Sequence, residues 1–236
     1  MAASRRIWVT RTQPEAEATA ARVRALGWTP VVQPVLSARI CADAKIDLTG
    51  AEAIAFTSGH AVRAFAALSP MRALPVFAVG EATAALARAA GFADVRTAAG
   101  DVRALADILA ASEPKPALVL NPTARAPAAD LAALFAPLRM KVRKIVVYET
   151  VSAGPDVPPD AIDAILVHSP RAAEIIGALI AADQAARLEV FAISAAAAAR
   201  LSALPFVRVV VAVRPDEASL LALLATRGPA ASEGAA

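Results

Sequence analysis

The stretch R-K-I-V-V-Y-E-T-V, residues 143–151, carries the only tyrosine of the chain, Tyr148. Apart from Glu149, residues 145–151 are all β-branched or aromatic, which favours an extended strand over a helix. A buried strand does not need a phenol. Tyr148 is therefore either a core aromatic with a locally satisfied hydroxyl or a side chain with a chemical role. The place of this strand in an internal repeat favours the second interpretation.

The chain repeats a pattern of strands and helices after about 110 residues. E-A-I-A-F-T-S-G at residues 52–59 is matched by D-A-I-L-V-H-S-P at residues 163–170, an offset of 111. V-F-A-V-G at residues 76–80 is matched by V-F-A-I-S at residues 190–194, an offset of 114. Strand-like and helical runs alternate in both copies, which predicts parallel sheets covered by helices on both faces. We therefore expect an internal duplication that forms two similar, doubly wound, flavodoxin-like α/β domains.

Two arrangements of the copies fit this repeat. Either the copies fold one after the other and meet at the Pro-rich break 113–116, or the first strand-helix piece of each copy completes the sheet of the other. The second arrangement makes residues 33–40 and 144–151 strands that cross between the domains. Both are long for edge strands and neither is followed by a Gly turn, which favours crossing. Tyr148 would then face the cleft between the domains, where ligands of two-domain α/β proteins bind.

Local signals predict where three of the helices begin. Thr12 with Glu15 three residues later is typical of a capping box, which predicts a helix that ends at Gly27. A second helix is expected over about residues 125–138. Ser58 is expected to be the N-cap of a helix that follows the buried strand A-I-A-F.

Composition and charge exclude several classes of protein. The 236-residue chain has a net charge of +3 and a pI near 9.5, which suits a small anionic ligand. It has no block of like charges and no stripe of aromatic and basic residues, so we expect no nucleic-acid partner. Charged residues interrupt every apolar run before the about 20 residues of a membrane span, and no signal segment is present, so we expect a cytoplasmic protein without membrane contact. The single cysteine and two histidines argue against a disulfide or a metal cluster.

Ligands of open parallel sheets bind at the carboxyl ends of the strands, so residues there are candidates for binding. Hydroxyls, helix N-termini and arginines gather at these ends, and helix N-termini attract anions. The alternative for the hydroxyls is simple N-capping. No dinucleotide, P-loop or hydrolase-elbow motif is present, and both histidines fit a plain polar role. The candidates for binding are Arg11, Thr57, Ser58, Gly59, Thr83, Ser169, Arg171 and Ser194.

Five motifs stand in an order that carries further information. They are V-T-R-T-Q-P-E-A-E (9–17), A-I-A-F-T-S-G-H-A-V-R-A-F (53–65), V-F-A-V-G-E-A-T-A (76–84), V-V-Y-E-T-V (146–151) and A-I-L-V-H-S-P-R-A-A (164–173). In these motifs the chain resembles the uroporphyrinogen-III synthase family over nearly its whole length. The resemblance implies two domains joined by a two-stranded crossover. Domain 1 would comprise residues 1–35 and 152–236, domain 2 residues 41–144, and the crossover strands residues 36–40 and 145–151.

The resemblance also implies an activity. Family members close linear hydroxymethylbilane to uroporphyrinogen III, with inversion of the last pyrrole ring and loss of water, in tetrapyrrole biosynthesis. They need no cofactor or metal and act as monomers on this polycarboxylate substrate. The family tyrosine with a chemical role is Tyr148 here, so we expect it to help protonate the departing hydroxyl. Thr83, Ser58 and Ser169 match hydroxyls of the family site.

The second copy departs from the family pattern. Ser194 stands where a glycine is common, Ala197 stands at the position that corresponds to Thr83, and Asn121-Pro122 replaces an Arg- or Gly-rich turn. A lost hydroxyl and a lost glycine weaken carboxylate contacts on that side. The alternative hypothesis is therefore a non-catalytic two-domain binder of an anionic small molecule derived from this family. An intracellular relative of the sugar-binding hinge proteins is a more remote alternative.

Overall fold

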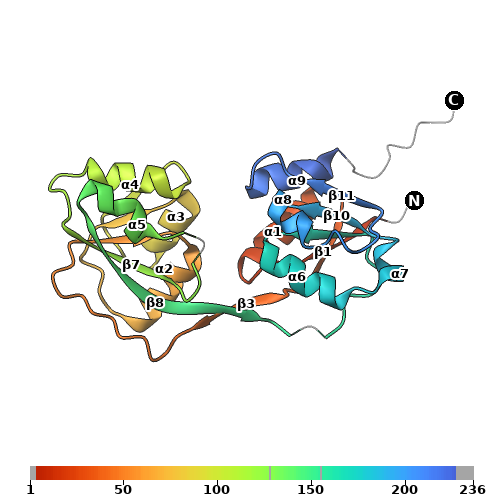
Figure 1. The fold of residues 1–236 in the computed structure, drawn as a ribbon, viewed down its shortest axis with the longest axis horizontal. Helices are drawn as coiled ribbons and strands as arrows, with labels where there is room; N and C mark the ends of the chain where they lie inside the picture. Colours follow the sequence, from red (N-terminus) through yellow and green to blue (C-terminus); the bar gives the residue numbers. More distant parts are fainter. Residues whose placement is uncertain (1–3, 128, 155, 227–236) are drawn as a thin grey trace. The chain divides into compact units, whose positions relative to one another are not determined.

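The computed structural model describes residues 4–127, 129–154 and 156–226 (Figure 1). The chain divides into two compact units, each with its own sheet. Unit 1 combines Met1–Ser37 with Val151–Ala236, and unit 2 is Ala38–Thr150. Within the described residues, no helix is long and apolar enough to cross a membrane.

Unit 1 contains a five-stranded parallel sheet in the order β11-β10-β9-β1-β2. Helices cover both faces of this sheet (Figure 1). Ile7 and Val9 pack under α1 and α9, while Trp8 packs under α6. The side chains of all three strand residues are fully buried. The strands are β1 (Arg6–Val9), β2 (Thr29–Val32), β9 (Ala164–Val167), β10 (Glu189–Ala192) and β11 (Arg208–Val211). The helices are α1 (Glu15–Ala25), α6 (Pro170–Leu179), α7 (Ala182–Ala185), α8 (Ala195–Ala199) and α9 (Glu217–Ala225).

Unit 2 contains a six-stranded sheet in the order β3-β8-β7-β4-β5-β6. Helices α2 and α3 cover one face, where Phe56 and Phe65 pack edge to face, and α4 and α5 cover the other. The strands are β3 (Leu36–Ile40), β4 (Ala53–Phe56), β5 (Val76–Ala78), β6 (Val95–Thr97), β7 (Leu118–Ala124) and β8 (Lys141–Ser152). The helices are α2 (Gly59–Leu68), α3 (Glu81–Ala89), α4 (Val102–Ala110), α5 (Leu131–Phe135) and the 3₁₀ turn η1 (Ala136–Leu138).

Exchanged pieces of chain complete both sheets. β1 pairs in parallel with β9, so that Ile7 lies opposite Ala164, and β7 pairs in parallel with β4, so that Val119 lies opposite Ala53. The first strand-helix-strand piece of each half therefore belongs to the sheet of the other half, which is the second of the two expected arrangements. The expected fold class, parallel α/β sheets covered by helices, is confirmed.

The two crossing strands, β3 and β8, are neighbours. The Cys41 N–H donates to the Val147 carbonyl at 2.9 Å, and the Ala153 N–H donates to the Val35 carbonyl at 3.0 Å. From the first pair to the second, the residue number falls along β3 and rises along β8, so the two segments run antiparallel. Both strands continue across the division between the units.

The strand order is the same in both sheets when each is read from its exchanged piece. The order β2-β1-β9-β10-β11 in unit 1 corresponds to β8-β7-β4-β5-β6 in unit 2, and β3 adds a sixth strand there. This correspondence supports the internal duplication, which stays a prediction.

The predicted helix starts were right in one place and wrong in two. Ser58 is the N-cap of α2, as expected, and its hydroxyl accepts from the Ala61 N–H. The helix expected from a Thr12 capping box begins instead at Glu15, with Pro14 as N-cap residue and no side-chain cap. The residue before a proline is disfavoured in helical conformation, so Gln13 cannot continue the helix towards Thr12.

The helix expected over residues 125–138 is much shorter. β7 continues to Ala124, and α5 with η1 covers only residues 131–138. The chain stays extended because β7 keeps its pairing with β8 up to Ala124. The Asp130 carboxylate then starts α5 by accepting from the Ala132 N–H.

Candidate functional site

In the sheet of unit 2, the order in which the chain adds strands reverses between the neighbouring parallel strands β7 and β4. The chain proceeds from β7 to β8 on one side and from β4 through β5 to β6 on the other. Ligands of open α/β sheets bind at such a reversal, outside the carboxyl ends of the strands. Thr57, Ser58 and Gly59 follow β4 there, with Ser58 and Gly59 forming the start of α2. Three predicted site residues therefore lie at the position favoured for binding.

Tyr148 reaches this position because β8 contains a bulge. Thr123 of β7 pairs with Val146, but the next residue, Ala124, pairs with Tyr148, so one residue of β8 is extra. Side chains alternate between faces along a strand, and an extra residue reverses the alternation. Val147 and Tyr148 are adjacent, yet both belong to the apolar cluster beneath α2. The bulge thus directs the phenol towards the α2 side of the sheet.

The phenol of Tyr148 contacts another predicted site residue. Its Oη lies 3.1 Å from the Ser58 Oγ, and either atom can donate. The Tyr148 side chain is nearly buried, with 8% of its surface exposed. Ser58 keeps its capping role at the same time, because its Oγ accepts from the Ala61 N–H at 3.2 Å. One hydroxyl therefore links the helix start and the phenol.

The His60 side chain also lies against Tyr148. The two ring centroids are 5.7 Å apart and the rings are tilted by 46°. The Arg63 Nη1 lies 3.5 Å from the His60 Nδ1. The sequence interpretation gave His60 no special role. Its position two residues after Ser58 was the available signal, but only the bulge in β8 brings the phenol to it.

Thr83 lies in the first turn of α3, after β5. Its side chain is buried, and within the described residues its hydroxyl makes no hydrogen bond. β5 pairs with β4, so the start of α3 lies at the same edge of the sheet as the start of α2. Nearby, Glu81 accepts from Arg88 and Thr97, and the Arg88 bond chiefly lowers the pKa of Glu81.

In the sheet of unit 1, the strand order reverses between the neighbouring strands β1 and β9. Arg11 and His168 follow these two strands in the chain. Arg11 is not available as an isolated cation. Its guanidinium is paired with Glu217 at the start of α9 and donates to the Thr19 hydroxyl at 3.2 Å. Glu217 also accepts from Thr19 at 2.5 Å and pairs with Arg22 at 3.3 Å. Burial lowers the pKa of Arg11 from its ordinary value.

His168 is held neutral beside this cluster. Both ring nitrogens are buried and have no hydrogen-bond partner in the described part of the chain. Burial, with a smaller effect from the Arg11 charge, lowers the pKa of His168 to about 3. A neutral imidazole with buried nitrogens is poorly suited to acid-base catalysis at neutral pH. The plain polar role expected from the sequence stays a prediction.

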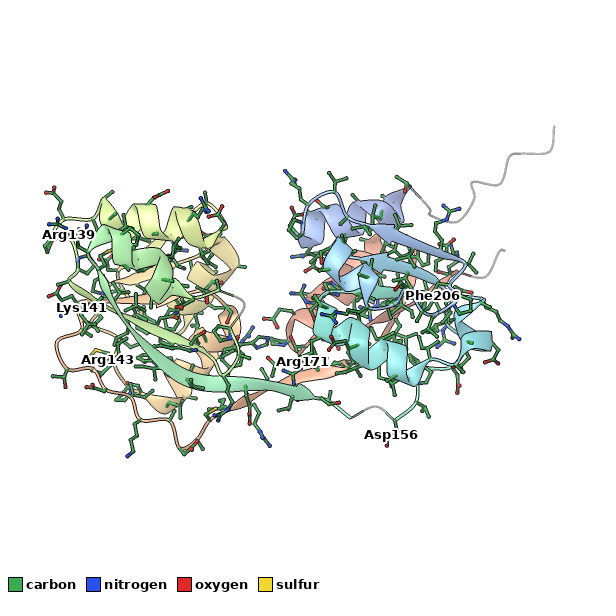
Figure 2. All side chains as sticks on the ribbon, viewed as in Figure 1. Arg139, Lys141, Arg143, Asp156, Arg171 and Phe206 are labelled. Carbon is green, nitrogen blue, oxygen red and sulfur yellow. The ribbon has the colours of Figure 1, made fainter. Side chains whose placement is uncertain are left out.

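The other predicted site residues of unit 1 lie at helix starts. Ser169 caps α6 by accepting from the Ala172 N–H, and Ser194 caps α8 by accepting from the Ala197 N–H. Arg171 is exposed in the first turn of α6 (Figure 2). No ion pair of its guanidinium is found among the described residues. Arg171 is thus a cation of unit 1 that is free to meet an anion.

The predicted candidates therefore fall into separate groups. In unit 2, Ser58, Gly59 and Tyr148 are brought together, and in unit 1, Ser169 and Arg171 share one helix start. The sequence interpretation missed Glu217, which lies 206 residues after Arg11 and carries no local signal of the pairing. Among residues 4–127, 129–154 and 156–226, no group of three or more His, Cys, Asp and Glu side chains could hold a metal ion.

Comparison with known proteins gives consistent matches. Residues 17–222 match the family model described as uroporphyrinogen-III synthase HemD. The structure is similar to the uroporphyrinogen-III synthetase of Helicobacter pylori, with a TM-score of 0.67 and 17% identity over 95% of this chain and 100% of that one. It is also similar to a mutant uroporphyrinogen III synthase of Thermus thermophilus, with a TM-score of 0.50 and 17% identity over 95% of this chain and 99% of that one. No curated protein matches the sequence.

Proposed function

Because the chain belongs to the uroporphyrinogen-III synthase family, we propose that Tyr148 supplies the proton for its dehydration step and that helix starts and arginines hold the substrate. The reaction of this family closes hydroxymethylbilane to uroporphyrinogen III with inversion of the last pyrrole ring and loss of water. The chain is accordingly a cyclising lyase of tetrapyrrole biosynthesis. The comparisons give no support to the alternative of a non-catalytic binder.

The main observation that supports this role of Tyr148 is its hydrogen bond to Ser58, at the point in the unit 2 sheet where the strand order reverses. A phenol there can donate its proton to the oxygen of the hydroxymethyl group. The carbon–oxygen bond then breaks, its electron pair leaves with the oxygen as water, and a cationic methylene remains on an electron-rich pyrrole. This leaving group departs easily, so a single proton donor need not carry most of the rate enhancement.

Positioning of the chain of pyrroles is the larger task. Orientation of reacting groups supplies about 7–11 kcal/mol, whereas proton transfer is worth about 10²–10⁴-fold. The substrate has eight carboxylates, which suit backbone N–H groups at helix starts and guanidinium groups. We assign carboxylate binding to Thr57, Gly59, Thr83, Ser169, Arg171 and Ser194. Ser58 was predicted to bind a carboxylate as well.

Arg171 is the strongest of these candidates because its charge is unpaired within the described residues. Arg11 can meet a substrate carboxylate only if the Glu217 carboxylate gives way. We therefore rank Arg11 below Arg171, although both remain proposals.

The decisive experiment supplies hydroxymethylbilane to the purified protein. The type III isomer must form in preference to the type I isomer that arises by spontaneous closure. Uroporphyrinogens are oxidised and separated by chromatography, and a sample without protein gives the spontaneous background. A product that remains type I at every protein concentration overturns the activity and favours the non-catalytic binder.

We further propose that the protein works as a cytoplasmic monomer without a cofactor or metal. Light scattering coupled to gel filtration should give the 24.1 kDa mass of one chain. Dialysis against a chelator should leave the rate of type III formation unchanged. A dimer mass or a rate that falls on dialysis contradicts the respective part of this proposal.

A further inference from the structure

The hydroxyl of Ser58 is already engaged by two groups of the protein. It accepts from the Ala61 N–H at 3.2 Å and lies 3.1 Å from the Tyr148 Oη. A serine hydroxyl has one proton to donate and two lone pairs to accept with. The Ala61 bond uses one lone pair, and the phenol takes the proton or the second lone pair. Ser58 is therefore better placed to act on the phenol than on a substrate carboxylate.

We propose that Ser58 and His60 are positioning residues that act through Tyr148, with Ser58 holding the phenol oxygen and His60 bracing the phenol ring. The inference rests on the proposed role of Tyr148 as proton donor. It changes the role of Ser58 from a ligand of the substrate to a partner of the acid, and it gives His60 a role that the sequence did not indicate.

Ser58 can serve both protonation states of the phenol because its hydroxyl rotates. At rest, the Ser58 Oγ can accept a hydrogen bond from the Tyr148 hydroxyl. Before the reaction, the Ser58 Oγ–H instead donates to the Tyr148 oxygen, which leaves the phenolic proton directed at the substrate. When the phenolic proton moves to the departing hydroxyl, the phenolate oxygen accepts from Ser58. Hydrogen bonds to a charged oxygen are about twice as strong as neutral ones, so Ser58 favours the transferred state.

The proton balance closes over one turnover. Tyr148 gives one proton to the leaving hydroxyl, which departs as water. The substituted carbon of the last ring bonds to the cationic methylene, its bond to its original methylene breaks, and that methylene bonds to the unsubstituted carbon of the same ring. This last carbon releases one proton as the ring regains its aromatic state. That proton returns to the phenolate, so the substrate loses only water and no other acid is consumed.

His60 supports the geometry by packing against the phenol ring. Its ring lies 5.7 Å from the Tyr148 ring, centroid to centroid, in a tilted arrangement that suits aromatic pairs. Because Ser58 is the N-cap of α2 and His60 lies in its first turn, a single helix start fixes both the oxygen and the ring of the phenol. The role of His60 in this arrangement is packing and requires no proton transfer.

Unit 1 contains a matched control for Ser58. Ser169 stands 111 positions later and caps α6 in the same way, with the Ala172 N–H at 3.1 Å from its Oγ. The position that corresponds to Tyr148 at this offset is Ser37, so Ser169 has no phenol partner there. Ser58→Ala and Ser169→Ala therefore remove equivalent caps, and only the first removes a bond to the phenol.

The single tyrosine allows a direct spectroscopic test in the full chain. Protein labelled with ¹³C at the tyrosine Cζ gives one resonance, which belongs to Tyr148. Ser58→Ala should shift this resonance, Ser58→Thr should restore it, and Ser169→Ala should leave it in place. A resonance that does not move in Ser58→Ala overturns the bond. This readout is independent of activity, so it stands even if the role of Tyr148 in catalysis fails.

Kinetics then test whether Ser58 acts through the phenol. Ser58→Ala should lower kcat about fivefold to tenfold, the difference between a hydrogen bond to a charged oxygen and one to a neutral oxygen, with little change in KM. In the Tyr148→Phe background the same change should have no further effect on kcat. A raised KM with unchanged kcat, or fully additive losses, assigns Ser58 to the substrate and overturns the inference while Tyr148 keeps its role. If Tyr148→Phe alone has no effect, the proposed role of Tyr148 fails instead.

His60 is tested with a pair of variants that separate packing from imidazole chemistry. His60→Ala should lower kcat and broaden the Tyr148 Cζ resonance, because the ring is no longer held in one position. His60→Phe keeps an aromatic ring and should recover most of the lost kcat. Equal losses in the two variants overturn the packing role.

Discussion

The carboxylate of Asp163 accepts a hydrogen bond from the backbone N–H of Arg6 at 2.7 Å, although 157 residues separate the two. The bond ties the first residue of the exchanged strand β1 to the start of β9. Unit 2 contains the same contact, in which the Glu52 carboxylate accepts from the Ala117 N–H at 2.6 Å. Asp163 lies 111 positions after Glu52, and Ala117 lies 111 positions after Arg6. In each unit, therefore, the same kind of hydrogen bond, from a backbone N–H to a carboxylate, holds the exchanged strand.

The hydrogen bond between Asp163 and Arg6 should contribute little to the free energy of unfolding. Asp163→Ala should lower the free energy of unfolding by about 0.5 kcal/mol, the lower end for a hydrogen bond, because the contact is exposed. Asp163→Asn keeps an acceptor and should restore most of the loss. Urea titration followed by circular dichroism measures both. Equal losses in the two variants mean that the charge, and not the hydrogen bond, stabilises the strand.

Tyr148→Phe should lower kcat without abolishing formation of the type III isomer. The expected loss lies towards the lower end of the about 10²–10⁴-fold range for proton donors, because the leaving hydroxyl departs easily. The measurement is the initial rate of type III formation at saturating hydroxymethylbilane. An unchanged kcat removes Tyr148 from the mechanism.

Replacement of His168 should change how stability depends on pH. In the folded protein its pKa is lowered to about 3, against an ordinary value of 6.5. The unfolded chain therefore takes up a proton as the pH falls below about 6.5, while the folded chain does not until about pH 3. This linkage removes up to about 1.4 kcal/mol of stability per pH unit within that window and has no effect above it.

His168→Phe should therefore flatten the fall of stability between about pH 6.5 and pH 4 relative to the original chain. At pH 8 the variant should be at least as stable, because the buried ring nitrogens have no partner among the described residues. Urea titrations at several pH values measure the difference, which cancels the common contribution of the carboxyl groups. Parallel curves for the two proteins would show that the imidazole titrates normally.

Arg11 and Glu217 should behave as a structural pair. Arg11→Ala and Glu217→Ala should each lower the free energy of unfolding by about 1–2 kcal/mol, between the values for exposed and buried pairs. The double variant should lose less than the sum, since no charge is left without its partner. Thermal and urea unfolding of the four proteins give the coupling energy. If Arg11→Ala instead leaves stability unchanged and raises KM, Arg11 binds the substrate.

Arg72 should contribute strongly to the stability of unit 2. Its guanidinium donates to the carbonyls of Ala66, Ser69, Met71 and Ala90 at 2.6–3.1 Å and lies 5.0 Å from the centre of the Phe92 ring. It thereby closes the ends of α2 and α3. Arg72→Ala should cost about 2–3 kcal/mol, and Arg72→Lys should recover little, because an ammonium group cannot reach these divergent carbonyls.

Arg103→Ala provides the matched control for Arg72. Arg103 is exposed on α4, and no bond of its guanidinium is found within the described residues. This variant should change stability by less than about 0.5 kcal/mol. A comparable loss in both variants would show that general charge, and not the carbonyl contacts, explains the effect of Arg72.

Much of the protein followed from its sequence alone. The alternation of strands and helices and the Ser58 cap were predicted from local patterns, and the choice of Tyr148 came from its lone occurrence in the repeat. These features depend on residues close together in the chain, where side-chain periodicity and capping chemistry act. The short α5 was missed because pairing of β7 with β8 extends the strand, and such pairing is not a local property.

The tertiary structure decided the rest. The bulge in β8 turns Tyr148 towards Ser58 and His60, and Glu217 engages Arg11 from 206 residues away. Strand register and the pairing of distant charges are set by how packed elements fit together, and a shift of one residue reverses the face of every following side chain. The sequence therefore determined which groups the protein has for its chemistry, and long-range packing decided which of them meet.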